Sequence, residues 1–176
     1  MPGDTPPLNE AYLSLGSNIE PEANLPAAVR ELARFGRIVR VSSVWESPPE
    51  GFADQPHFLN AALLLETHLP AAELKERAIA AIEARLGRQR SANRNAPRTI
   101  DIDIMLFNHE CLTIGSRTIP DAEVLERPFV AIPLAEIAPA YRHPVTGETL
   151  AVIASRFDPL KAGLVRRDDV VLAPSV

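Results

Sequence analysis

The stretch RTIDIDIMLF, residues 98–107, has the period-two alternation of a β-strand, with isoleucine at every second position of its first half. Successive side chains of a strand point to opposite faces of the sheet. Asp101 and Asp103 therefore share one face, about 7 Å apart at a rise of roughly 3.3 Å per residue. The opposite face is predicted to carry the apolar residues of a core, namely Ile100, Ile102, Ile104 and Leu106.

The carboxylate pair is the first candidate site. Two neighbouring carboxylates repel each other, and burial adds to that cost. A divalent cation removes the repulsion, and Mg²⁺ held together with phosphates is typical of such a pair. Two solvated acids on an exposed sheet face are the alternative. Asp-x-Asp also occurs in glycosyltransferases, which need a larger domain, and in phosphatases with an aspartyl nucleophile, whose strand ends soon after the motif, whereas this one continues to Phe107.

The segment just before this strand is rich in arginine, with Arg85, Arg88, Arg90, Arg94 and Arg98. A solvated arginine face is one explanation of such a cluster. However, surface ion pairs contribute little to stability, so a network of pairs alone gives a weak reason for it. Guanidinium groups beside a metal-bound phosphate neutralise the charge that develops during phosphoryl transfer. The cluster and the carboxylate pair together favour a site for Mg²⁺ and phosphates.

Composition argues against a general nucleic-acid-binding protein, a membrane protein and a disulfide-bonded one. The 176 residues are 46% hydrophobic and carry a net charge of −5, which argues against general affinity for nucleic acid. No apolar run approaches the roughly 20 residues that span a bilayer, and the start lacks a signal-peptide pattern, so we expect no membrane partner. Cys111 is the single cysteine, which excludes an internal disulfide and fits a reducing compartment. We expect a cytoplasmic protein with one domain over residues 1–176, frayed at 1–9.

Periodicity and turn residues predict the order βαββαβ, which is typical of the α+β ferredoxin-like fold, an antiparallel sheet backed by helices. The predicted elements are strand 11–15, helix 21–35, strand 37–46, strand 58–66, helix 70–86 and the Asp strand. A C-terminal part follows, with a hairpin near 110–114 and short helices near 129–137 and 149–157. The tail 164–172 reads either as a short edge strand or as disordered, and the order of residues 160–176 stays open.

The same βαββαβ order also serves non-catalytic nucleotide- or RNA-binding modules, so the fold alone does not decide the function. An RNA-binding version carries aromatic residues on its central strands as stacking platforms. Only 5% of this chain is aromatic, and its Asp strand presents negative charge where RNA would bind. An enzyme is therefore the favoured interpretation, and a binding module is the alternative.

Three separated motifs give a more specific indication. They are AYLSLGSNI at 11–19, SPPEGFADQPHFLNAAL at 47–63 and APRTIDIDIML at 96–106. Their order and spacing resemble the 6-hydroxymethyl-7,8-dihydropterin pyrophosphokinases of folate biosynthesis, and the resemblance extends to RPFVAIPLAEIAP at 127–139. It implies a ferredoxin-like enzyme that transfers the pyrophosphoryl group of MgATP to the pterin hydroxymethyl group and leaves AMP. It also implies a functional link to other folate-pathway enzymes.

The resemblance assigns roles to individual residues. It implies two Mg²⁺ ions on Asp101 and Asp103, with Arg88 and Arg98 as catalytic contacts to the triphosphate. Further ATP contacts are implied at Glu83, Arg90, Ile104, Arg117, Thr118 and Arg127, although a helical ion pair explains Glu83 nearly as well. The implied pterin site consists of Ser47, Pro48, Phe58, Asn60, Asn95 and Phe129. Aromatic faces and a carboxamide suit this role, because a flat heterocycle stacks on rings and its edge needs both donors and acceptors.

Three residues depart from the familiar pattern of these enzymes. Asn95 stands where some members carry a tryptophan, Glu50 where some are apolar, and Asp121 where a histidine often contacts ATP. The carboxylate pair and the arginines are retained, so we expect activity with altered affinities. For Asp121 we expect a helix-capping role, or an ion pair with Arg117 or Arg127, and no direct contact with ATP.

Overall fold

The computed structural model describes residues 3–51, 53–93 and 95–172. Its main sheet is antiparallel, and its strands are β5 (Asp101–Phe107), β1 (Asn9–Ser17), β4 (Phe58–Thr67), β2 (Arg37–Val41), β3 (Trp45–Ser47) and β8 (Val165–Arg166). The order across the sheet is β5-β1-β4, with β2 and β3 both paired to β4 and β8 paired to β3. This arrangement confirms the predicted ferredoxin-like fold, with its second strand in two pieces.

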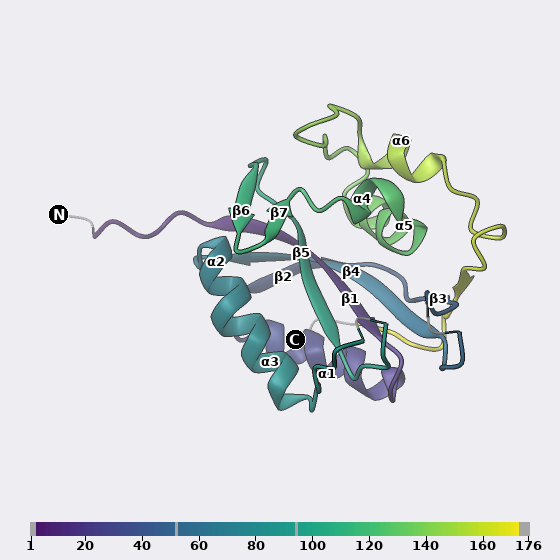
Figure 1. Ribbon diagram of the computed structural model, residues 1–176. Coiled ribbons are helices and arrows are strands. Elements are labelled where there is room, and N and C mark those ends of the chain that lie inside the picture. The colour runs from purple at the N-terminus through teal and green to yellow at the C-terminus, as the bar shows by residue number, and fades with distance from the viewer. Residues whose placement is uncertain (1–2, 52, 94, 173–176) are drawn as a thin grey trace.

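Helices cover both faces of the sheet (Figure 1). One face carries α1 (Pro21–Leu32) and a long helix made of α2 (Ala71–Glu73), the π-helix η1 (Leu74–Ile79) and α3 (Ala80–Arg85). The other face carries α4 (Glu123–Glu126), α5 (Pro128–Ile137) and α6 (Leu150–Ser155). Each face has its own buried apolar cluster. No helix in the described ranges is long and apolar enough to cross a bilayer.

A β-bulge in β5 changes the predicted alternation. Leu13 pairs with Ile104 and Tyr12 pairs with Leu106, so Met105 is an extra residue in this strand. Ile104 faces the core under α1, whereas Met105 and Leu106 both pack in the cluster under α5. The prediction that Leu106 shares the isoleucine face is therefore wrong, because a bulge reverses the faces beyond it. Asp101 and Asp103 precede the bulge, and their shared face is retained.

The predicted single strand over 37–46 is also wrong. It ends at Val41 and resumes at Trp45, because the hydroxyl of Ser42 accepts a hydrogen bond from the backbone N–H of Ala62 at 2.8 Å. A side chain thus takes the place of a backbone acceptor at this point of the ladder. The break lets β3 leave the line of β2 and carry Ser47 to the edge of the site.

Other boundaries differ by a few residues. The first helix ends at Leu32 rather than 35, the second begins at Ala71, and the hairpin spans 112–119, with strands β6 (Leu112–Ile114) and β7 (Arg117–Ile119). The tail forms the edge strand β8, and Val170 and Leu172 are buried beyond it. Residues 173–176 lie outside the described ranges. Residues 3–8 carry no helix or strand, but the prediction that fraying extends to residue 9 is wrong, because Asn9 begins β1 and pairs with Thr67.

Candidate active site

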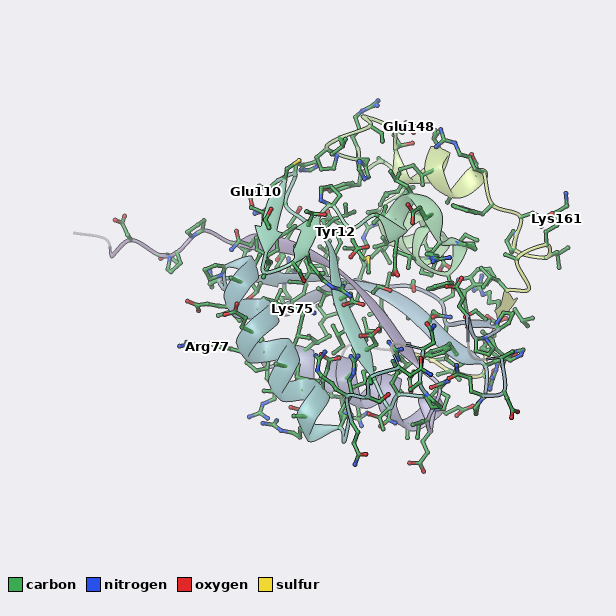
Figure 2. The ribbon with its side chains drawn as sticks, in the orientation of Figure 1. Tyr12, Lys75, Arg77, Glu110, Glu148 and Lys161 are labelled. Carbon is green, nitrogen blue, oxygen red and sulfur yellow. The ribbon has the colours of Figure 1, made fainter. Side chains whose placement is uncertain are left out.

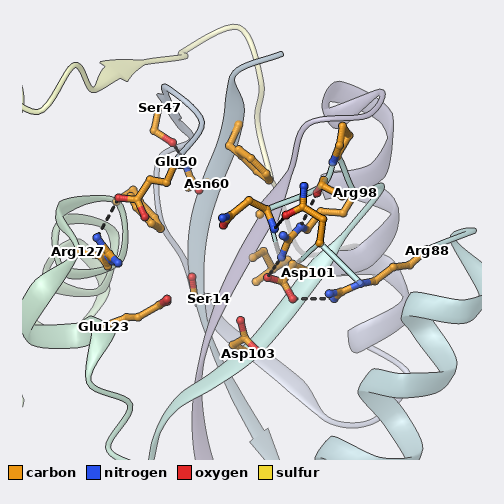
Figure 3. A pocket seen from close by; sticks show the side chains of 18 of the residues that line it. Ser14, Ser47, Glu50, Asn60, Arg88, Arg98, Asp101, Asp103, Glu123 and Arg127 are labelled. Atoms are coloured by element: carbon orange, nitrogen blue, oxygen red, sulfur yellow. Dashed lines mark hydrogen bonds and ion pairs between the residues drawn. The ribbon is translucent and has the colours of Figure 1, made fainter. Parts of the chain in front are cut away.

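A cavity of about 850 Å³, here called the main cavity, opens on the α5 side of the sheet (Figure 3). Its walls come from β1, β5, the β3–β4 loop, the loop that follows α3, and the start of α5. It brings together most of the predicted site residues, namely Ser47, Pro48, Phe58, Asn60, Arg88, Arg90, Asn95, Arg98, Asp101, Asp103, Arg117, Arg127 and Phe129. Residues more than 80 positions apart in the sequence thus line one space.

The turn after β1 positions Arg98. The side-chain oxygen of Asn18 accepts a hydrogen bond from the backbone N–H of Arg98 at 2.8 Å, and the Asn18 N–H donates to the Arg98 carbonyl at 3.1 Å. These two bonds fix the chain just before β5. They place the Arg98 guanidinium 5.8 Å from the centre of the Phe58 ring and 3.0 Å from Asp101. The GSN turn therefore positions a cation, rather than capping α1, whose first turn receives no side-chain cap.

Asp101 is held by two arginines. Its carboxylate oxygens lie 2.7 Å from Nη1 of Arg88 and 3.0 Å from Nη1 of Arg98. Burial alone would raise the pKa of Asp101, but the two guanidinium groups outweigh it and hold this pKa below its ordinary value. Asp101 is therefore a stable anion in the protein without ligands.

The pKa of Asp103 is shifted in the opposite direction from that of Asp101. Burial and the neighbouring charge of Asp101 raise the pKa of Asp103 to about 7, although Nη1 of Arg117 lies 2.7 Å away and Nζ of Lys75 lies 3.6 Å away. Its negative charge is therefore only partly compensated. The repulsion predicted for the pair is present in the structure, and an additional cation at this point would relieve it.

The donor set fits Mg²⁺ only in combination with a substrate. Carboxylate oxygens are suitable ligands for this ion, and Mg²⁺ is commonly bound through one or two carboxylates plus substrate phosphates. Within the described parts of the chain, no three His, Cys, Asp or Glu side chains gather in a metal-binding arrangement. Asp101 and Asp103 therefore supply part of a coordination shell, and phosphate oxygens would supply more of it.

Lys75 is a residue that the sequence analysis missed. It lies in η1 on the side that faces β5, whereas Arg77 points away from the sheet (Figure 2). It lines a second cavity of about 310 Å³, which adjoins the carboxylate pair and also contains Ile104. A π-helical turn changes which side chains face the sheet, and such turns are frequent at functional sites. The apolar periodicity of a regular helix gives no direct signal for it.

Some predicted residues lie away from the main cavity. Glu83 is almost fully buried and forms ion pairs with Arg88 and, at 3.7 Å, with Arg90, both of which follow α3 in the chain. Its contact with ATP stays a prediction. Thr118 is exposed on β7 and lines neither cavity, and its contact with ATP stays a prediction. Arg85 pairs with Glu31 on α1. Arg94 lies outside the described residues.

The other end of the main cavity carries the predicted heterocycle site. The Asn60 amide donates to the Ser47 hydroxyl at 2.8 Å and to the carbonyl of Trp45 at 3.0 Å, so its orientation is fixed. Phe58 and Phe129 both contribute to the lining. These residues provide flat apolar surfaces beside an oriented amide, which is suitable for binding a polar aromatic ring.

Residues 12–139 match the family model of the 7,8-dihydro-6-hydroxymethylpterin-pyrophosphokinases (HPPK). The chain belongs to the HPPK family. It is 39% identical over 140 residues to the 2-amino-4-hydroxy-6-hydroxymethyldihydropteridine pyrophosphokinase of Pseudomonas aeruginosa, which covers 78% of this chain and 85% of that protein. It is 41% identical over 155 residues to the enzyme of the same name from Methylorubrum extorquens, which covers 86% of this chain and 96% of that one.

A solved structure supports the fold independently. The HPPK-DHPS of Plasmodium falciparum, in a crystal with pterin and p-hydroxybenzoate, matches 93% of this chain with a TM-score of 0.72 at 14% identity. The match covers 46% of that chain, so this chain spans about half of the Plasmodium protein. At this identity the likeness concerns the fold alone.

Two departures from the HPPK pattern have partners in the structure. Glu50, on the β3–β4 loop, forms an ion pair with Arg127 at 3.1 Å and so connects that loop to the start of α5 (Figure 3). Asn95 contacts the same loop, where its carbonyl accepts a hydrogen bond from Gln55 at 2.7 Å. Gly51 has a φ of +75°, and a Cβ there would lie 2.3 Å from the Asn95 amide nitrogen. The Asn95 side chain is thus packed closely against the β3–β4 loop at Gly51.

The third departure, Asp121, caps a helix. One carboxylate oxygen accepts a hydrogen bond from the backbone N–H of Glu123 at 2.9 Å, and the other lies 3.5 Å from Arg117. Asp121 lines neither cavity. The predicted helix cap and the predicted ion pair with Arg117 are therefore both present. The Arg117 nitrogen that Asp121 contacts also lies 2.7 Å from Asp103, so this guanidinium separates the two carboxylates.

We expect Asp121→Ala to lower the free energy of unfolding by about 1 kcal/mol, because the cap of α4 is lost. Asp121→Asn keeps a side-chain oxygen at the cap, so the Michaelis constant for MgATP should stay within about threefold of the wild-type value. Denaturant unfolding and initial-rate kinetics measure the two effects. A tenfold or larger change in MgATP affinity for the asparagine variant would show that this carboxylate belongs to the nucleotide site.

Proposed function

We propose that the main cavity binds ATP and 6-hydroxymethyl-7,8-dihydropterin together and carries out the pyrophosphokinase reaction of the HPPK family there. In that reaction the hydroxymethyl oxygen attacks the β-phosphorus of ATP. The bond between this phosphorus and the α,β-bridging oxygen breaks, AMP leaves with that oxygen, and the hydroxyl proton is released. The observation that carries the proposal is the pair formed by the half-buried Asp101 and the buried Asp103, which faces a large cavity lined by arginines.

The nucleotide end of the site follows from the charges. Arg88 and Arg98 each bind the Asp101 carboxylate through one guanidinium nitrogen, and the same nitrogen of Arg88 also pairs with Glu83. A guanidinium has five donors in a planar fork, a geometry that matches the oxygens of a phosphate group. Arg90, Arg117 and Arg127 extend the positive lining toward the mouth of the cavity. This set compensates the charge of a triphosphate and stabilises the charge that moves to AMP as the bond breaks.

Asp101 and Asp103 would hold Mg²⁺, and we assign two ions to this pair as the resemblance implies. When bound, Mg²⁺ neutralises phosphate charge and supplies the cation that the pair lacks. Lys75 and Arg117 hold Asp103 in the protein without ligands. Both side chains are long and flexible, so phosphate oxygens can compete for them once Asp103 has a metal as its partner.

The heterocycle end accepts the pterin in this proposal. Phe58 and Phe129 offer ring faces, and Asn60 offers an oriented amide to the ring edge. Ser47, Pro48 and Asn95 close the space around it. The hydroxymethyl group would then point toward Asp101 and the triphosphate. A non-catalytic binding module is disfavoured, because such a module gains nothing from two neighbouring carboxylates that repel each other.

The test is the stoichiometry of turnover. Purified protein with MgATP and 6-hydroxymethyl-7,8-dihydropterin should form AMP and pterin diphosphate in equal amounts, because each transfer releases one molecule of each. ADP as the product, or AMP formed without the pterin, would contradict the proposal. Three further expectations stay predictions: that residues 1–176 act as one domain, that the protein is cytoplasmic, and that it has a functional link to another folate-pathway enzyme.

A further inference from the structure

The C-terminal segment after α6 returns to the sheet beside the predicted pterin site. It lies outside residues 12–139, which match the family model. Val165 pairs with Glu46 and Arg166 pairs with Trp45, so β8 extends the sheet along β3. The backbone N–H of Arg167 continues the ladder with a 2.9 Å bond to the carbonyl of Val44. The segment therefore pairs with the chain from Val44 to Glu46, directly before Ser47 (Figure 1).

Arg167 fastens this segment to two other elements. Its guanidinium lies 2.9 Å from the carboxylate of Glu46 in β3 and 3.4 Å from that of Glu22 in α1, and 2.8 Å from Asp169 within the segment. Val170 and Leu172 follow and are buried in the core under α1. The neighbouring Arg166 instead pairs with Asp168 in the same segment, and its side chain is 58% exposed.

Gly163 brings the segment into contact with the cavity wall. Its φ is +72°, and a Cβ placed there would lie 3.2 Å from Cγ of Pro48 and 3.4 Å from Cδ. The glycine backbone is thus packed against the proline ring, in a conformation that side chains rarely adopt. Pro48 lines the main cavity, and the adjacent Ser47 accepts the hydrogen bond that orients Asn60.

These contacts form a continuous path from the C-terminal segment to the heterocycle site. We propose that residues 163–167 position the pterin-binding wall, with Gly163 holding Pro48 and Arg167 holding β3, so that Ser47 and Asn60 keep the geometry that the pterin needs. This inference rests on the proposed function, which puts the pterin against these residues. Gly163 and Arg167 act through Pro48 and β3 and are positioning residues, since neither lines the cavity.

The matched pair Arg167→Gln and Arg166→Gln tests the proposal. Both variants remove one positive charge, from adjacent positions of the C-terminal segment. We expect Arg167→Gln to raise the Michaelis constant for the pterin at least fivefold and to leave that for MgATP within twofold. Arg166→Gln should change neither constant by more than twofold. A residue that only stabilises the fold would lower the melting temperature without separating the two constants.

Gly163→Ala provides a second, independent variant, because it acts on Pro48 without removing a charge. We expect the same selective rise in the pterin constant. Equal rises for both substrates, an unchanged pterin constant in folded protein, or failure of both variants to fold would overturn the proposal, since the segment would then be only a structural element. Absence of AMP formation by the wild-type protein would instead refute the proposed function, which keeps the two failures distinguishable.

Discussion

Replacing Asp103 by asparagine is expected to lower kcat/KM at least a hundredfold and, at the same time, to raise the melting temperature. The loss of one strong electrostatic contact to a transition state costs roughly 3–4 kcal/mol. The gain in stability has a separate cause. Burial and the charge of Asp101 raise the pKa of Asp103 to about 7 in the folded protein, so its ionised form is disfavoured there.

The sign follows from linkage. A carboxyl group whose pKa is higher in the folded state than in the unfolded state binds more protons when folded. Such a group destabilises the folded state fully at pH values above its folded-state pKa. The destabilisation disappears at pH values below its unfolded-state pKa. At pH 8 without Mg²⁺ the Asp103→Asn variant lacks this cost, and thermal unfolding should show a melting temperature about 2 °C or more above wild type.

Asp101→Asn is the matched control, because it removes the other carboxylate of the pair. Activity should fall to a similar extent, but the melting temperature should fall as well, since Arg88 and Arg98 lose the anion that they stabilise. Near-wild-type activity of either variant at saturating Mg²⁺ would show that the metal assignment is wrong. A lower melting temperature for Asp103→Asn would show that its contacts with Arg117 and Lys75 outweigh the repulsion.

Arg98→Lys should lower kcat/KM for MgATP roughly thirtyfold, which corresponds to a loss of about 2 kcal/mol of transition-state stabilisation. The stability of the fold should change little. Lysine keeps the charge, but it loses the planar fork of donors that can bind Asp101 and a phosphate together. It also loses the flat group that lies above the Phe58 ring. Initial-rate kinetics at saturating pterin measure the effect.

Arg85→Lys is the control for this substitution. Arg85 belongs to the same arginine-rich stretch, but it pairs with Glu31 on α1 and lines neither cavity. Its replacement should leave the kinetics unchanged. If Arg98→Lys were equally silent, Arg98 would contribute only local positive potential, and its place in the catalytic set would be lost.

The sequence alone was sufficient to predict the general fold and the shared face of Asp101 and Asp103. Alternation in β5 predicts that Asp101 and Asp103 share a face, because this feature depends only on the two-residue period of a strand. The position of Leu106 could not be predicted in this way. It depends on the bulge at Met105, which arises from pairing with β1, a partner almost a hundred residues away.

The electrostatic partners of the site were harder to predict than its anions. Lys75 reaches Asp103 from a π-helical turn, and the ion pair of Glu50 with Arg127 joins the β3–β4 loop to the start of α5. Both depend on how separate elements pack. Glu83 is similar, since its ion pair with Arg88 depends on how the loop after α3 folds back on the helix.

The most direct test of pyrophosphoryl transfer uses ATP labelled with ³²P at the β-position. With the pterin present, the β-label should appear in the pterin diphosphate, and unlabelled AMP should form in equal amount. Asp103→Asn should abolish this transfer under the same conditions. If the β-label stayed in ADP and only a γ-label reached the pterin, the enzyme would transfer a single phosphoryl group, and the proposed chemistry at Asp101 and Asp103 would be contradicted.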